Sequence, residues 1–338
     1  MLKSVRFWIG MLISIACLYF AFQGIQFDKL FDALTRMNYG WLLFAVALWC
    51  VSYAGRVMRW QLLFAPQKMR LGKVFSALNI GYFLSNILPA RLGDFIRAYL
   101  IGDMENVSKA RALSTVVVER MSDGLTVVLL LALTALFVPN IPTEARQGAI
   151  GVAATGVVGI VFLLLLSFQK ERGMALLHRL ASPFPFLQRP GGWNALESLI
   201  DGFAVLRSPR PIIGVALWAI YAWVMGGIVF WVVMFATGLR DGAGAPLPAA
   251  AAFLVMTVTS LVVVIPSSPG YIGVFHYVAV LTLTSVYGVD KSAALSYAVV
   301  IHAVSYLWLT VLGIFSIWKE GLTYERLQAI GGQASTSE

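Results

Sequence analysis

The chain has 338 residues, of which 59% are hydrophobic and only 12% are charged, with a mean hydropathy of +0.81. Soluble domains average about half apolar and about a quarter charged residues, so this composition argues against an ordinary soluble enzyme. A net charge of +9 would suggest nucleic-acid binding in a soluble protein, but in a membrane protein it first reports orientation. The two cysteines, Cys17 and Cys50, lie in apolar runs and predict neither a disulfide framework nor a thiolate metal site. We expect no cofactor and no nucleic-acid partner.

Six apolar segments predict full transmembrane helices, because a crossing needs about 18 or more apolar residues. They are 7–23, 40–57, 112–138, 147–168, 211–237 and 292–317. The first resembles a signal peptide, but no small-residue cleavage site follows it and further spans come after it, so we expect it to remain uncleaved. The second is predicted to end at a membrane interface, marked by Arg56, Arg59 and Trp60.

Two further regions predict broken or re-entrant hairpins. Residues 74–88 form an apolar run of about 15 residues, which is roughly 22 Å of helix against a hydrocarbon core of about 30 Å. This run breaks at Asn86 and Pro89. The second region, 249–287, has two apolar halves separated by Pro266-Ser267-Ser268-Pro269-Gly270. Non-helical backbone at membrane depth is tolerated only where protein buries it or where it lines a water-filled cavity.

The order of these elements repeats along the chain. Residues of about 1–140 and 147–320 each read as crossing, crossing, hairpin and crossing, and the odd number of crossings places the halves in opposite orientations. Inverted repeats with broken helices point to a transporter whose site lies at the repeat interface. We therefore predict an all-α polytopic membrane protein with six full helices and two re-entrant hairpins arranged as an inverted repeat.

The basic residues orient this arrangement. With the N-terminus inside, most of the 25 Lys and Arg fall on the side of the N-terminus and few fall on the other, as the positive-inside rule requires. We expect one integral domain over 1–338 in the plasma (inner) membrane, with a cytoplasmic loop at 169–210 and a short cytoplasmic tail at 321–338. Both termini are then cytoplasmic.

Three charges interrupt the otherwise apolar helix predicted at 112–138. Glu119 and Asp123 share a face at a spacing of four residues, and Arg120 can pair with Asp123 at a spacing of three. Charges inside a membrane normally face a partner or a wet cavity and mark a pathway; the alternative is that Glu119 begins the helix at the interface. Arginine also binds phosphate bidentately. The predicted partners on the first hairpin are Arg91, Asp94 and Arg97.

The break in the second hairpin predicts a second part of the substrate site. Ser267, Ser268, Gly270 and Gly273 are expected to present backbone N–H groups at a helix start, where anions bind; the alternative is a plain turn. His276 shares a helix face with Gly273 and is more often a structural histidine than a proton carrier in such a position. We predict no catalytic residue and no metal ligand.

Three segments resemble the signatures of a known family. They are Asn86-Ile87-Leu88-Pro89-Ala90-Arg91-Leu92-Gly93-Asp94-Phe95-Ile96-Arg97-Ala98-Tyr99, Val117-Val118-Glu119-Arg120-Met121-Ser122-Asp123 and Pro269-Gly270-Tyr271-Ile272-Gly273-Val274-Phe275. In this order they look like the lysylphosphatidylglycerol synthase transmembrane family of flippase-like membrane domains. The resemblance implies a membrane domain that moves a lipid or lipid-linked headgroup between leaflets. It places these residues at the headgroup cavity: Arg91, Arg97, Glu119, Arg120, Asp123, Gly270 and Gly273.

Two departures from the family pattern qualify this resemblance. His276 stands where the family usually has an acidic residue, and the chain ends at Glu338, so we expect a stand-alone member without the soluble aminoacyl-transferase domain.

Three functions follow as hypotheses. The first is translocation of a phospholipid or lipid-linked headgroup by a transporter that is not an enzyme, with anionic membrane lipids as partners. The second is a membrane-embedded transferase in glycolipid or isoprenoid (including hopanoid) biosynthesis, although the sequence has no Asp-x-Asp pair for a metal. The third is an accessory protein that partners a lipid-modifying enzyme.

Overall fold

The computed structural model describes residues 5–88, 92–138, 209–262 and 268–322, together with 147, 150, 151 and 154. Apart from an isolated bridge between Arg240 and Pro246, the regular elements of this part are all helical, which confirms the predicted all-α class there. Several predicted features lie outside the described residues: nearly all of the crossing 147–168 and of the loop 169–210, most of the tail, Pro89, Arg91, Pro266 and Ser267.

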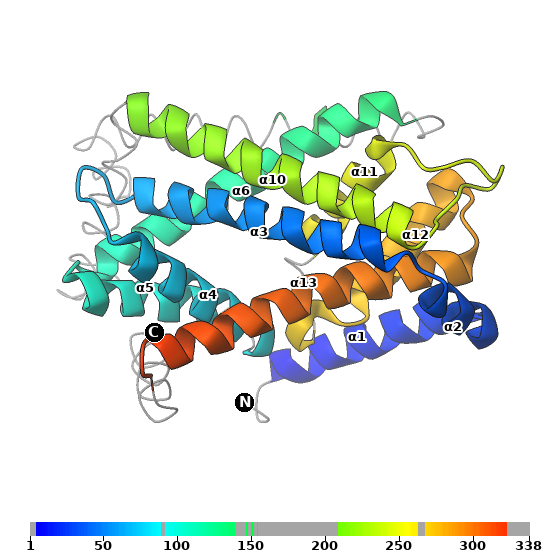
Figure 1. Ribbon diagram of the computed structural model, residues 1–338, viewed down its shortest axis with the longest axis horizontal. Helices are drawn as coiled ribbons and strands as arrows, with labels where there is room; N and C mark the ends of the chain where they lie inside the picture. The colour runs from blue at the N-terminus through cyan, green and yellow to red at the C-terminus, as the bar shows by residue number, and fades with distance from the viewer. Residues whose placement is uncertain are drawn as a thin grey trace.

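Four long helices run along the molecule (Figure 1). They have 24 to 29 residues, or about 36–44 Å at 1.5 Å per residue, enough to cross a bilayer core of about 30 Å. They confirm that the predicted spans 40–57, 112–138, 211–237 and 292–317 are helical, and their bounds are α3 (Tyr39–Leu62), α6 (Lys109–Phe137), α10 (Pro209–Ala236) and α13 (Lys291–Lys319).

Two helices precede α3. The first predicted span forms α1 (Val5–Phe22), and the short helix α2 (Phe27–Thr35) connects it to the region of α3. The side chain of Asn38 then caps α3, because its carbonyl oxygen accepts hydrogen bonds from the N–H groups of Gly40 and Trp41.

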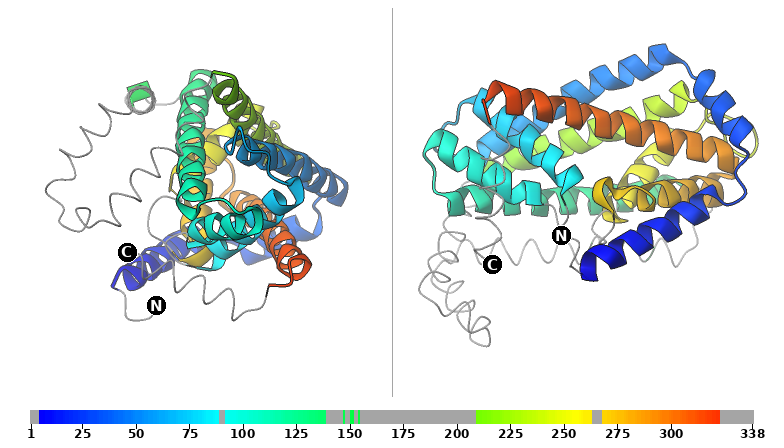
Figure 2. Two further views of the ribbon diagram at one scale, coloured as in Figure 1. Left: turned by 90° about the vertical axis from the view of Figure 1, so that its left-hand side faces the viewer. Right: turned by 90° about the horizontal axis from the view of Figure 1, so that it is seen from below.

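Both predicted hairpin regions consist of shorter helices. The first contains α4 (Leu71–Ile87) and α5 (Leu92–Glu105). The second contains α11 (Ala249–Val262), the 3-10 turn η3 (Pro269–Tyr271) and α12 (Val274–Tyr287). These α-helices have 14 to 17 residues, about 21–26 Å. The two pairs lie toward opposite ends of the molecule (Figure 2).

By length and composition, four described segments can cross a membrane: Tyr39–Leu62, Arg210–Ala236, Pro269–Tyr287 and Lys291–Lys319. The third of these joins η3 to α12. This part of the second predicted hairpin is therefore long and apolar enough to span on its own. Large apolar side chains on the long helices remain exposed, as lipid-facing residues would be; they include Leu43, Leu129, Leu217, Val311 and Trp318.

A glycine pair brings α4 and α5 together. A Cβ atom added to Gly93 on α5 would lie 1.9 Å from the carbonyl oxygen of Gly81 on α4, and one added to Gly81 would lie 2.6 Å from Cβ of Arg97. The two backbones can approach this closely only because neither position has a side chain. The contact fixes the position of α5 against α4 and therefore the positions of Asp94 and Arg97 on α5.

The two predicted breaks lie beside each other. Gly270 in η3 has φ +70°, and a Cβ atom there would lie 2.7 Å from the ring of Tyr306 and 3.7 Å from the carbonyl oxygen of Asn86. Glycine is required because the backbone is left-handed and the space is filled. The end of α4 and the turn η3, far apart in sequence, therefore meet inside the protein.

Candidate functional site

Six charged side chains from three helices form a closed circuit of alternating charge, which we call the ion-pair ring. Glu119, Arg120 and Asp123 come from α6, Asp94 and Arg97 from α5, and Arg59 from α3. Each member contacts two members of opposite sign, in the order Asp123, Arg59, Glu119, Arg97, Asp94, Arg120 and back to Asp123. Its three cations and three anions give a formal net charge of zero.

Glu119 forms the buried side of the ring. Its Oε1 accepts hydrogen bonds from Arg59 Nη2 at 2.9 Å and from the Tyr82 hydroxyl at 2.9 Å, and its Oε2 accepts one from Arg97 Nη1 at 2.7 Å. The side chains of Glu119, Arg59 and Arg97 have no exposed surface. Such desolvated charges are stable only when paired and hydrogen-bonded, so this side of the ring is part of the protein interior.

Asp123 and Asp94 form the side that faces open space. Asp123 Oδ1 accepts from Arg59 Nη1 at 2.6 Å and from Trp223 Nε1 at 2.8 Å, while Oδ2 lies 3.6 Å from Arg120 Nη1. Asp94 holds Arg120 bidentately, through Nε at 2.9 Å and Nη2 at 2.6 Å. The predicted pairing of Arg120 with Asp123 is confirmed, and so is the predicted approach of Asp94.

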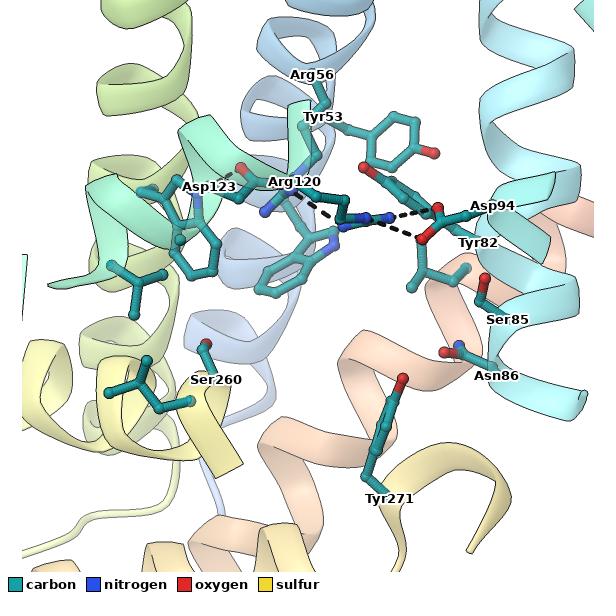
Figure 3. Close-up of a pocket in the computed structure, with 16 residues that line it drawn as sticks. Tyr53, Arg56, Tyr82, Ser85, Asn86, Asp94, Arg120, Asp123, Ser260 and Tyr271 are labelled. Carbon is teal, nitrogen blue, oxygen red and sulfur yellow. Dashed lines mark hydrogen bonds and ion pairs between the residues drawn. The ribbon is translucent and has the colours of Figure 1, made fainter. Parts of the chain in front are cut away.

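A cavity of about 430 Å³, which we call the central cavity, adjoins the ring. Asp94, Arg120 and Asp123 form one wall, whereas Arg97 and Glu119 lie behind it. Figure 3 shows Arg120 between the two carboxylates, with Ser85, Asn86, Tyr271 and Ser260 farther along the cavity. The remaining lining residues are mostly aromatic or aliphatic: Trp49, Tyr53, Tyr82, Gly124, Val127, Trp223, Leu261 and Leu309, together with Arg56. The cavity thus has the charged ring at one side, and the rest of its lining is mostly apolar with a few polar side chains and Arg56.

Arg56 differs from the arginines of the ring. It lies one turn before Arg59 on α3, and its Cζ is 5.5 Å from the ring centroid of Trp223, a cation–π contact. The ion pairs found among the described residues do not include Arg56. It also lines a second space of about 160 Å³, which shares Trp49, Trp223 and Ser260 with the central cavity.

The second-hairpin residues lie apart from the ring. The Ser268 N–H donates to Ser14 Oγ at 2.8 Å, its hydroxyl donates to the Ile272 carbonyl at 2.9 Å, and the Gly273 N–H donates to His276 Nδ1 at 3.4 Å. The N–H groups of Ser268 and Gly273, which we expected to be available to an anion, are therefore bonded within the protein. Of the described part of this segment, Tyr271 reaches the central cavity.

His276 is packed against a second histidine. Its ring stacks on that of His302 with centroids 4.8 Å apart, and the Phe275 ring lies 4.8 Å from His302. His276 is 9% exposed and is absent from the lining of the central cavity. This placement agrees with a structural histidine.

Helix α3 runs past the end of the predicted span 40–57, and two of the three residues expected to mark a membrane interface lie inside the protein. The helix continues to Leu62, and Arg59 and Trp60 are fully buried, because the carboxylates of α6 neutralise Arg59 and the Trp60 N–H donates to Thr115 at 3.0 Å. Sequence reasoning therefore missed Arg59 as a member of the ring and Arg56 as a cavity residue. The one available signal was their spacing of three residues, which places both on one face of the helix.

Comparison with known proteins agrees with this architecture. The model of the lysylphosphatidylglycerol synthase transmembrane region matches residues 7–313. The chain belongs to this family. It is an integral membrane protein.

Individual relatives are more distant. The chain is 23% identical to Glycosyltransferase AglD of Haloferax volcanii over 93% of its own length, but it spans only 54% of that protein. A UPF0104 membrane protein of Pyrococcus horikoshii is 22% identical and is covered over 97% of its length, with 94% of this chain. A UPF0104 membrane protein of Methanocaldococcus jannaschii is 24% identical over 68% of this chain and 91% of its own length.

Proposed function

We propose that the protein translocates a phospholipid or lipid-linked headgroup between membrane leaflets, through the central cavity. The observation that carries the proposal is the position of Arg120. Its side chain is 31% exposed toward the cavity while Asp94 and Asp123 hold it from either side. A charged group that is both partnered and open to a cavity inside a membrane protein is typical of a substrate pathway.

The remaining lining suits an amphiphile. A headgroup needs charged and hydrogen-bonding partners, which Arg120, the Asn86 amide and the Ser260 and Tyr271 hydroxyls provide, and the acyl or isoprenoid chains stay in lipid. Arg97 and Glu119 take a different role in this proposal. Because they have no exposed surface, they position the ring and do not contact the headgroup.

The placement in the membrane belongs to the same proposal. We place the protein in the plasma (inner) membrane with both termini cytoplasmic, and we treat the pairs α4–α5 and α11–α12 as hairpins of an inverted repeat that enter from opposite sides. The distribution of basic residues supports the orientation. The arrangement of the two pairs at opposite ends of the molecule supports the repeat (Figures 1 and 2).

Translocation can be measured in liposomes that contain the purified protein and phosphatidylglycerol with a fluorescent acyl chain, by the fraction of fluorophore that external dithionite reduces. The wild type should make both leaflets accessible, and Arg120→Ala should lose this activity because the cavity loses one of the two cations in its lining. Arg36→Ala, which removes an arginine that follows α2 and is 80% exposed, is the control and should translocate normally. A fully active Arg120→Ala protein, folded by size-exclusion chromatography, would refute the proposal.

A second candidate is a membrane-embedded transferase or an accessory protein in glycolipid or isoprenoid lipid biosynthesis. The observation in its favour is the relative named Glycosyltransferase AglD, which aligns over 93% of this chain. Because the chain spans only 54% of that relative, the activity in the relative's name cannot be assigned to this chain from the alignment alone. Formation of a glycosylated lipid by the purified protein from a nucleotide sugar and a polyprenyl phosphate would favour the transferase.

A further inference from the structure

Two residues of α3 that line the central cavity carry hydrogen-bond donors without a protein acceptor in the described part of the chain. Arg56 enters none of the ion pairs found there, and the buried Tyr53 hydroxyl has no hydrogen-bond partner. The two residues are three apart on the helix, so they lie on one face, and both line the cavity. Tyr53 is only 4% exposed. A buried hydroxyl without a partner is destabilising, so the pair indicates a missing acceptor.

The charge of the site gives the sign of that acceptor. The ion-pair ring is formally neutral, since its three arginines are matched by Asp94, Glu119 and Asp123. Arg56 therefore leaves the site with one net positive charge. In an apolar surrounding, an uncompensated charge favours a ligand of opposite charge.

The size of that charge distinguishes classes of phosphate. A phosphodiester carries one negative charge and brings the site to neutrality, whereas a phosphomonoester carries about −1.5 to −2 near neutral pH. Because the other arginines are already held by carboxylates, a second negative charge would have to displace Asp94 or Asp123.

We propose that Arg56, assisted by the Tyr53 hydroxyl, is the anchor for the phosphodiester of the transported lipid. This inference rests on the proposed function and names the chemical class of its substrate. Arg56 lines both the central cavity and the adjoining space of about 160 Å³. A phosphodiester at its guanidinium therefore lies where the two spaces meet, and the rest of the headgroup extends toward Ser260 and Tyr271. Arg120 then positions the headgroup without being the primary phosphate ligand.

Binding of short-chain lipids to the purified full chain in detergent, measured by microscale thermophoresis, tests this assignment. Dihexanoyl phosphatidylglycerol is the phosphodiester probe, dihexanoyl phosphatidic acid is the monoester, and dihexanoylglycerol is the uncharged control. Arg56→Gln should weaken phosphatidylglycerol binding at least about tenfold, because a charge-assisted hydrogen bond is lost. Arg56→Lys should recover part of the affinity and Tyr53→Phe should lose severalfold. Arg36→Gln should bind as the wild type does.

Three results would overturn the assignment: wild-type affinity in Arg56→Gln, equal binding of dihexanoylglycerol, or tighter binding of phosphatidic acid than of phosphatidylglycerol. Arg56→Gln should unfold at the wild-type temperature, since it breaks no ion pair. If Arg56→Gln proves less stable than the wild type, the binding affinity of Tyr53→Phe provides the test instead. A wild type that binds phosphatidylglycerol through Arg56 but fails to translocate it would contradict the proposed function alone. If the wild type translocates phosphatidylglycerol and Arg56→Gln binds and translocates it equally well, the role of Arg56 as anchor would be contradicted while the proposed function would stand.

Discussion

Replacing Glu119 by glutamine tests the electrostatic role of the ion-pair ring with little change of shape. Glu119 accepts three hydrogen bonds, from Arg59, Arg97 and Tyr82, and has no exposed surface. The amide is neutral and presents N–H groups toward one of the two guanidinium groups, so the ring acquires an uncompensated positive charge. Removing one partner of a buried ion pair costs about 3–5 kcal/mol. We expect a loss of this size in the free energy of unfolding.

Unfolding in mixed micelles of dodecyl maltoside and sodium dodecyl sulfate measures that difference. Asp32→Asn is the matched control, because Asp32 pairs with Arg36 and both side chains are exposed, by 52% and 80%; exposed pairs contribute about 1 kcal/mol or less. Adding Arg97→Met to Glu119→Gln should restore part of the lost stability by removing the unpaired cation. Equal losses for Glu119→Gln and Asp32→Asn, or a double variant less stable than the single one, would refute the reasoning.

Two further predictions concern the packing and the end of the bundle. Gly93→Ala should destabilise the protein by about 1–3 kcal/mol, because the added Cβ would lie 1.9 Å from the Gly81 carbonyl oxygen. Gly124→Ala is the control: a Cβ there meets nothing within 4 Å, so this variant should be neutral or slightly stabilising in the same unfolding assay. Equal effects of the two substitutions would contradict the close contact between α4 and α5. At the end of α13, burial raises the pKa of Glu320, but the hydrogen bond from Lys73 at 2.5 Å, a hydrogen bond from Ser76 and the charges of Lys73 and Lys319 together outweigh burial and lower the pKa below its usual value of 4.5. The pair should therefore stabilise the protein fully above about pH 4.5, and this contribution should be lost as the pH falls below that value. Thermal melting between about pH 7 and pH 3 should therefore depend less on pH in Glu320→Gln than in the wild type, and an unchanged pH dependence would contradict this.

Hydrophobicity and local spacing were sufficient to predict much of this structure. The spans at 112–138, 211–237 and 292–317 are long apolar runs, which few folds other than a buried helix can satisfy. The cluster of Glu119, Arg120 and Asp123 was found because charges are conspicuous in such a run. Their pairing at a spacing of three residues is a property of any helix.

Contacts between residues far apart in the sequence could not be predicted from local spacing in the same way. Arg59 lies 60 residues before Glu119, and near the end of an apolar run an arginine that snorkels to an interface has the same local sequence as one that is buried. Which of the two occurs depends on the carboxylates of another helix. The same holds for Ser268, whose N–H is occupied by Ser14, 254 residues away.

The ring also constrains how the chain enters the bilayer during synthesis. Arg59 emerges from the ribosome on α3, but its carboxylates follow only on α6. Until then the arginine has no carboxylate partner, and its guanidinium has to stay hydrated near the end of α3, because a lone charge at the bilayer centre costs about 2.5 kcal/mol or more on insertion scales. The helices from α3 to α6 are therefore expected to leave the insertion machinery together. A nascent chain that stops between α3 and α6 should be held at the translocon or degraded, since it contains half of a salt bridge and no partner in lipid.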